Sequence, residues 1–270
     1  MTVMLDDVLS RFDAADVHHL PGGHVVVAGE YVEPMQRIPS CLVDYVSPEL
    51  AAAPDAADVL VAWAKEAFPA AKMLLVRLTD EDASLLGFED YLFYMMLTKP
   101  PTPHADETPI DVRPARPEDL EFVGSFLVEA FDDGLEMRLL PAEEDAGTKQ
   151  ARTVLKDPDA RSFVASCDGE NIGHATLLVN QADQVTGQEF VELLDFLVER
   201  KHPMRYPAES ALVTHTWKYA QDLGLPVLSH IVVREKTCHC AGVELMILDR
   251  LYTRGWEFSH KYQRYMFPAS

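Results

Sequence analysis

The chain has 270 residues, 48% of them hydrophobic, which is enough apolar material for one large domain or two small ones. Its 44 acidic residues outnumber 23 basic ones, and the formal net charge of −21 repels phosphate backbones and anionic lipid surfaces. We therefore expect neither nucleic acid nor a membrane as a partner, while the charge either attracts cationic amines or only favours solubility.

The N-terminus lacks the basic and apolar regions of a secretory signal, and no later stretch holds the roughly 18 apolar residues of a membrane helix. The four cysteines are too few and too scattered for a disulfide framework, which suits a reducing compartment. Cys238-His239-Cys240 lacks the second pair of ligands that a tetrahedral zinc site needs. The sequence therefore predicts a cytoplasmic protein that holds no metal.

The first hundred residues alternate between strand-like and helix-like patterns of apolar side chains. These patterns predict strands at 24–32, 41–46, 72–78 and 91–97, a helix at 56–68 and a short helix at 80–88. A linker should follow at 98–117, because that segment carries six prolines and almost no large apolar side chains. We expect two domains, 1–105 and 106–270, with a short strand at 110–112 opening the second.

Helical spacing of apolar residues predicts a helix at 118–131, and a polar stretch after it predicts a second helix ending near Lys156. Two apolar runs separated by the turn-forming residues 168–171 predict a hairpin. The next strand, 190–198, is almost continuously apolar, as expected when both faces are covered.

The remaining elements follow in regular alternation. Residues 207–212 lead into a helix at 211–225 that Gly224 ends, and 227–233 is a β-branched strand. A helix at about 243–254 and a closing aromatic strand at 256–267 complete the chain.

This order of elements, together with four stretches of sequence, resembles the GNAT acetyltransferase superfamily. The stretches are IDVRPARPEDLEFVGSFLVEAF, DGENIGHATLLV, RYPAESALVTHTWKYAQDLGLPVLSHIVV and LDRLYTRGWEF. The resemblance implies an α+β fold, a mixed and mostly antiparallel central sheet flanked by helices. It also implies acetyl-CoA as co-substrate, with an amine as acceptor.

The N-terminal part is similar to a second, degenerate copy of the same domain. SLLGFEDYLFYMML resembles LYTRGWEFSHKYQRYMF, so an internal duplication and a tandem GNAT-like arrangement are predicted. Between Val46 and Val59 this copy has no phosphate-binding glycine, and we expect it not to bind CoA but to complete the fold or line the acceptor pocket.

The family holds the CoA pyrophosphate in a loop of the form Arg/Gln-x-x-Gly-x-Gly/Ala. A pyrophosphate there meets the backbone N–H groups that open a helix, where the dipole favours negative charge. The best match here is Arg205-x-x-Ala208-x-Ser210, in which both glycines are replaced. The resemblance implies cofactor contacts from this segment, namely Arg205, Tyr206, Ala208, Ser210 and Ala211.

The strand before this loop is expected to contribute backbone donors as well. Enzymes of this kind splay that strand from the next one, and the exposed N–H groups hold the pantetheine arm and polarise the thioester carbonyl. Phe196, Leu197 and Val198 occupy that place here. The resemblance therefore implies that these three residues bind the cofactor.

Three residues are the catalytic candidates. Tyr252, in LYTRGW, matches the family tyrosine that protonates the leaving thiolate, although a half-buried structural tyrosine is the equal alternative. Glu192 and Asp195 are candidate bases, and strict alternation would place them on opposite faces of their strand. His174 and His230 are interpreted as core residues of strands.

The sequence thus favours acetyl transfer from acetyl-CoA to an amine of a small molecule, by a monomer or homodimer. Two alternatives remain open at this stage. One is a GNAT-like binding or regulatory module without catalysis, motivated by the missing glycines. The other is a tandem aminoacyl or acyl transferase, against which the negative charge argues.

Overall fold

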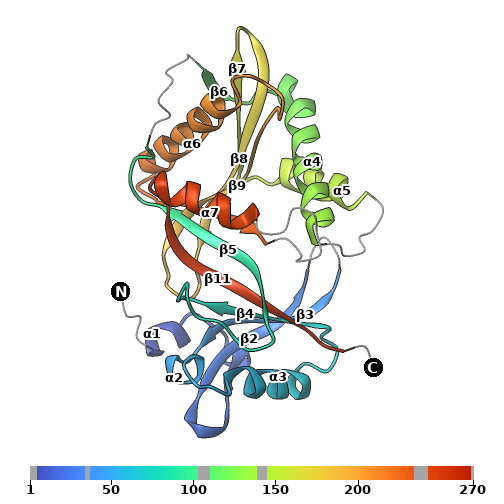
Figure 1. The fold of residues 1–270 in the computed structure, drawn as a ribbon, viewed down its shortest axis with the longest axis vertical. Helices are drawn as coiled ribbons and strands as arrows, with labels where there is room; N and C mark the ends of the chain where they lie inside the picture. The colour runs from blue at the N-terminus through green and yellow to red at the C-terminus, as the bar shows by residue number, and fades with distance from the viewer. Residues whose placement is uncertain (1–4, 34–36, 103–109, 139–144, 234–242, 269–270) are drawn as a thin grey trace. The chain divides into compact units, whose positions relative to one another are not determined.

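The structure is a computed structural model that describes residues 5–33, 37–102, 110–138, 145–233 and 243–268. Its contacts divide the chain into two compact units (Figure 1). Unit 1 comprises residues 1–93, 182–188 and 259–270, and unit 2 comprises 94–181 and 189–258. Two later segments thus group with the N-terminal part, so this division differs from a single boundary at residue 105.

Unit 1 is a twisted sheet with short helices. Its strands are β1 (Val17–His19), β2 (Val25–Val32), β3 (Pro39–Val46), β4 (Met73–Leu78) and the larger part of β11 (Glu257–Met266), in the order β1-β2-β3-β4-β11. All neighbours are antiparallel except β3 and β4, which run parallel. The helices are α1 (Leu5–Leu9), α2 (Pro48–Ala51) and α3 (Ala56–Ala67).

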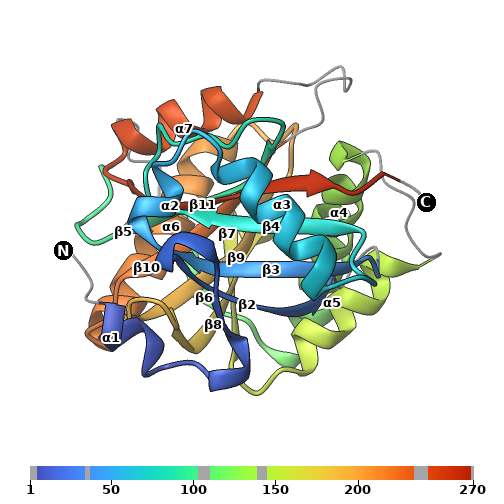
Figure 2. The ribbon, with the colours of Figure 1, turned by 90° about the horizontal axis from the view of Figure 1, so that it is seen from below.

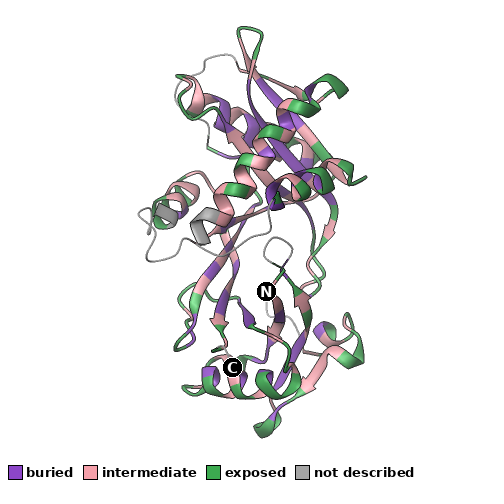
Figure 3. Ribbon diagram, turned by 90° about the vertical axis from the view of Figure 1, so that its right-hand side faces the viewer, coloured by how far each residue is buried: buried purple, intermediate pink, exposed green. Residues whose placement is uncertain are grey.

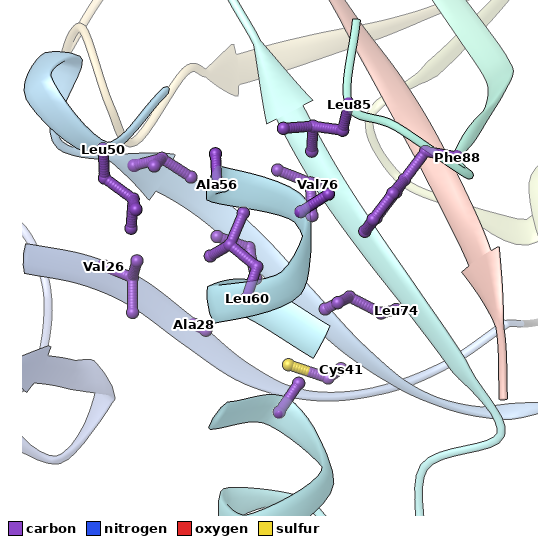
Figure 4. Close-up of a cluster of buried hydrophobic side chains, with 14 of the residues drawn as sticks. Val26, Ala28, Cys41, Leu50, Ala56, Leu60, Leu74, Val76, Leu85 and Phe88 are labelled. Carbon is purple, nitrogen blue, oxygen red and sulfur yellow. The ribbon is translucent and has the colours of Figure 1, made fainter. Parts of the chain in front are cut away.

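The core of unit 1 lies between helix α3 and the strands β2, β3 and β4, as Figures 2 and 4 show. Leu60 projects from α3 onto Val26 of β2, Cys41 of β3 and Leu74 of β4, all of them buried. Burial raises the pKa of the Cys41 thiol to about 12, so this cysteine stays protonated and unreactive.

Unit 2 carries the other strands and the remaining helices of the described residues. The strands are β6 (Asp111–Pro114), β7 (Ala160–Cys167), β8 (Glu170–Ala182), β9 (Glu189–Val198), β10 (Val227–Val232) and the end of β5 (Glu89–Leu97), in the order β6-β7-β8-β9-β10-β5. The helices are α4 (Leu120–Arg138), α5 (Ala146–Lys156), α6 (Arg205–Asp222) and α7 (Val243–Thr253).

The two faces of this sheet are covered by different helices (Figure 1). Helices α4 and α5 form one buried cluster with Val164 of β7 and Leu194 of β9. Helix α6 covers the opposite face, where the Phe163 ring packs 4.6 Å from His215 and 5.4 Å from Tyr219. Figure 3 shows the buried residues concentrated in the strands between these layers. The sheet is mixed and mostly antiparallel, which confirms the predicted α+β class.

A buried carboxylate fixes the start of helix α4. Asp119 accepts hydrogen bonds from the Arg113 guanidinium of β6 at 2.5 and 3.0 Å and from Asn171 of β8 at 3.1 Å. It also caps the chain by accepting the Arg116 backbone N–H at 2.8 Å. The hydrogen bonds from Arg113 hold the pKa of Asp119 far below its usual range, so the carboxylate stays ionised and ties two strands to the helix.

Two of the predicted elements differ from the structure. Residues 80–88 form no helix but an irregular loop, because the Leu85 N–H donates to Gln263 Oε1 of β11 at 2.8 Å and Gly87 has a φ of +81°. Helix α6 begins at Arg205 instead of near Ala211. Pro207 lies in its first turn, where its missing N–H costs no hydrogen bond.

No helix in the described ranges is both long enough and apolar enough to span a membrane. The same residues contain no cluster of three or more His, Cys, Asp or Glu side chains that could hold a metal ion. Cys238-His239-Cys240 lies outside the described residues.

Candidate active site

The parallel pairing of β9 and β10 stops halfway along both strands. Its register joins Val191–Leu193 of β9 to Val227–Ser229 of β10, whereas β9 continues to Val198 and β10 to Val232. The second halves of the two strands therefore lie beyond this register, as the resemblance implied for the strand that precedes the CoA loop. An opening of this kind leaves backbone groups at the edge of β9 available for a ligand.

A β-bulge in β9 lies at the same point. The Val191 N–H donates to Pro226 O on the β10 side, yet the Glu199 N–H donates to Ile172 O on the β8 side. In a regular strand, the N–H groups of two residues an even number of positions apart, such as Val191 and Glu199, point to the same neighbouring strand. Here they point to opposite neighbours, so the backbone contains one extra residue between them. The change lies between Leu193, the last residue of the ladder, and Glu199.

The bulge places the two candidate carboxylates on one face of the sheet. Leu194 packs into the cluster of α4 and α5, and Asp195 contacts His174, whose cross-strand partner Val164 belongs to that cluster. Glu192 shares the face of Leu194 because it lies two residues before it. The prediction that Glu192 and Asp195 occupy opposite faces is therefore wrong, and the reason is the extra residue between them.

Gly173 of β8 allows the end of β9 to approach closely. A Cβ atom there would lie 2.7 Å from Val198 Cγ2 and 2.8 Å from the Leu197 carbonyl oxygen, distances that no side chain can occupy. The Leu197 carbonyl thus faces β8, and alternation turns the N–H groups of Phe196 and Val198 toward the β10 side. Among the three donors expected from the sequence, Phe196 and Val198 point into the opening and Leu197 does not.

Asp195 is the outer end of a buried polar chain. Its Oδ2 lies 3.1 Å from His174 Nε2, off the line of a well-aligned hydrogen bond. His174 Nδ1 lies 3.2 Å from Thr176 Oγ1, which is 2.9 Å from Ser162 Oγ. His174 and Thr176 are fully buried, while Asp195 keeps part of its side chain exposed. These buried polar residues hold the Asp195 side chain in its orientation from the interior of the protein.

Glu192 has a histidine partner as well. Its Oε1 lies 3.5 Å from His230 Nδ1 on β10, and the His230 ring lies 5.8 Å from the ring of Tyr94 on β5. Both side chains remain partly exposed, His230 at 25% and Glu192 at 18%. His230 was expected to be a core residue, but it is the first β10 residue after the ladder ends.

The residues matched to the CoA loop lie within the first turns of α6 instead of a loop before it. Ala208 is fully buried, and Ser210 and Ala211 are half-buried on the same helix. Arg205 Nε donates to Glu209 Oε1 at 2.8 Å, and Tyr206 is 48% exposed beside it. Arg205 and Tyr206 are therefore the members of this set that reach the surface at the helix start.

Arg250 of α7 joins this corner and was missed from the sequence. Its Nη2 donates to Glu209 Oε2 at 3.0 Å, and its guanidinium lies 4.7 Å from the centroid of the Tyr206 ring. Two arginines thus flank one buried carboxylate at the start of a helix. Arg250 lies 41 residues after Glu209, in the stretch LDRLYTRGWEF, so no local spacing links it to the CoA motif.

A pocket of about 320 Å³ lies beside the end of β9. It is lined by Phe126 and Glu129 of α4 and by residues 198–201 at the end of β9 and in the turn after it. Arg200 lies at the edge of the pocket and forms ion pairs with Glu129 at 3.1 Å and with Asp133.

Tyr252 is 37% exposed on α7, two residues after Arg250, and its role in the reaction stays a prediction.

A mixed sheet with a bulged and splayed central strand, a long helix after it and two helices on the opposite face defines the GNAT type of fold. Two solved structures share it over most of the chain. They are an acetyltransferase of the GNAT family from Colwellia psychrerythraea (13% identity, 91% of this chain and 81% of that chain, TM-score 0.53) and a GCN5-related N-acetyltransferase from Sphaerobacter thermophilus (16%, 99%, 87%, TM-score 0.55). At these identities the likeness shows the fold.

The sequence comparisons are less informative. No family model matches the chain. A curated protein, short-chain dehydrogenase/reductase family 16C member 6 from Bos taurus, is 28% identical over 90 residues. That match covers 28% of this chain and 27% of the length of the relative, so it carries no conclusion about activity.

Proposed function

We infer that the chain is an N-acyltransferase that moves an acetyl group from acetyl-CoA to an amine of a small molecule, with its site in unit 2. The observation that carries this proposal is the coincidence of three features on β9. The ladder to β10 ends at Leu193, the strand bulges directly after it, and two carboxylates lie on the same face on either side of the bulge.

The opening beside β9 suits the pantetheine arm of acetyl-CoA. The N–H groups of Phe196 and Val198 would donate to its amides and to the thioester carbonyl, where negative charge develops as the amine attacks. At the start of α6 the helix dipole would favour the pyrophosphate, and Arg205 and Arg250 would add positive charge there. Ala208 is too deeply buried to touch phosphate directly.

The chemistry then needs two proton transfers. The acceptor amine must lose a proton as its nitrogen bonds to the carbonyl carbon, and Glu192 and Asp195 are the carboxylates on that face of the strand. The departing sulfur must gain a proton as the C–S bond breaks, a role we assign to Tyr252. The acidic surface of the protein favours a cationic acceptor.

The test combines binding and turnover. Calorimetry should detect acetyl-CoA, a thermal shift should accompany it, and CoA release should appear with at least one member of a panel of primary amines. Calorimetry that detects no association with any acylated coenzyme would refute the transferase.

A non-catalytic binding module is the second candidate, favoured by the buried Ala208 in place of the family glycine. Binding of acetyl-CoA without turnover of any amine in the panel would support that module. The same titration with RNA at low and high salt would test the aminoacyl-transfer alternative.

A further inference from the structure

We propose that His230 is the group that accepts the proton of the attacking amine, and that Glu192 acts through it as a positioning residue. This deepens the proposed function and rests on it. His230 is the first residue of β10 beyond the ladder with β9. It thus lies where β9 and β10 begin to separate, which is where the proposed function places the thioester carbon.

The side chain of His230 faces the same side of the sheet as both carboxylates. Leu228 of β10 is the register partner of Glu192, and residues two apart on a strand share a face. Its Nδ1 is buried and lies 3.5 Å from Glu192 Oε1, while 25% of the side chain remains exposed. That arrangement leaves Nε2 as the acceptor for a substrate proton and aims Nδ1 at a carboxylate that stabilises the resulting imidazolium.

The other histidine on this face cannot do the same. His174 is fully buried, with Nε2 toward Asp195 and Nδ1 toward Thr176, so neither nitrogen can meet a substrate. Asp195 reaches the surface in its place. Glu192 on β9 and Tyr94 on β5 face His230 from the two neighbouring strands.

The reaction step balances with these groups alone. The neutral amine nitrogen bonds to the thioester carbonyl carbon, and its proton passes to His230 Nε2. The C–S bond breaks, and the thiolate takes a proton from Tyr252 or from water. His230 then releases its proton to solvent, which restores the neutral imidazole for the next turnover.

The experiment measures kcat, KM and the pH profile from pH 5.5 to 8.5 for the wild type and for H230Q, E192Q and D195N, with the amine that the panel identifies. H230Q should lower kcat about 100-fold or more and remove the acid limb of the profile, while acetyl-CoA affinity by calorimetry changes less than about twofold. E192Q should lower kcat about tenfold, because the imidazolium loses its carboxylate. D195N should retain the limb, and H19Q, at an exposed histidine of β1, should match the wild type in every parameter.

Retention of both kcat and the acid limb in H230Q would overturn the role of His230, as would loss of that limb in D195N alone. Acetyl-CoA binding without acetylation of any amine would overturn it too, since no proton transfer would exist for it to serve. Absence of acetyl-CoA binding in the wild type would instead overturn the proposed function itself. An H230N variant with an unchanged melting temperature guards against loss of folding as the cause of lost activity.

Discussion

We predict that a buried histidine of unit 1 makes the stability of the protein fall in mild acid. His260 of β11 is only 4% exposed, and its Nδ1 lies 3.0 Å from Ser259 Oγ. Burial, helped by the nearby Arg77 guanidinium, lowers the pKa of His260 to about 3, although Asp183 opposes the effect. Arg77 itself is held by two hydrogen bonds to Asp183, at 3.0 and 2.5 Å. A pKa lowered in this way favours the neutral imidazole in the folded protein at neutral pH.

The sign of the pH dependence follows from where the proton binds. The pKa of His260 is lower in the folded state than in the unfolded chain, so below about pH 6.5 the unfolded chain binds a proton that the folded one refuses. The stabilisation is complete above that pH and is lost as the pH falls. Each pH unit in this range costs about 1.4 kcal/mol, so the protein should lose about 2 kcal/mol of stability by pH 5 through this residue alone.

Replacing His260 by Gln should remove this loss. The free energy of unfolding is measured with urea and tryptophan fluorescence at pH 7.5, 6 and 5. Between pH 7.5 and pH 5 it should fall by about 2 kcal/mol more in the wild type than in H260Q. The window lies above the range where Asp183, whose pKa is lowered, takes up protons. Asp44, whose pKa burial raises, contributes with the opposite sign in both proteins. Parallel curves for the two proteins would refute the reasoning.

Three further predictions concern unit 2. Gly173→Ala should cost about 1–3 kcal/mol of stability and weaken acetyl-CoA binding, because the new Cβ would meet Val198 and the Leu197 carbonyl within 2.8 Å; unchanged calorimetry would contradict the close approach. Tyr252→Phe should lower kcat with little loss of CoA affinity, which steady-state kinetics and calorimetry separate. Arg205→Ala should weaken CoA binding, measured by the same titration, and full activity of both variants would show that the site is wrongly assigned.

The parts of the fold that depend on local chemistry could be predicted from the sequence. The turn Asp168-Gly169 has φ values of +51° and +84°, as the pattern of turn residues indicated for a hairpin. Gly224, with a φ of +74°, terminates helix α6 as expected. Each of these features is decided by one or two residues and their own backbone conformation.

Features decided by distant residues were missed. The loop at 80–88 has helix-like spacing of apolar residues. In the structure the Leu85 N–H donates a hydrogen bond to Gln263 of β11, and a local sequence pattern cannot indicate a partner 178 residues away. Arg250 lies far from the CoA motif in sequence and meets Glu209 only through the packing of α7. The same holds for the pairing of both strand histidines with carboxylates, which gives His174 and His230 different tasks.

The bulge in β9 has the largest consequence for function. With strict alternation, Glu192 and Asp195 lie on opposite faces, and only one of them could approach an acceptor. One inserted residue moves Asp195 to the face of α4 and α5, where Glu192 already lies, and at the same time turns the N–H groups of Phe196 and Val198 away from β8. A Cβ atom at position 173 would collide with the end of β9. The absence of a side chain at Gly173 of β8 therefore permits the end of β9 to lie there. The geometry that would hold a thioester and the geometry that would deprotonate an amine thus share one cause, and a substitution that straightens β9 should remove both together.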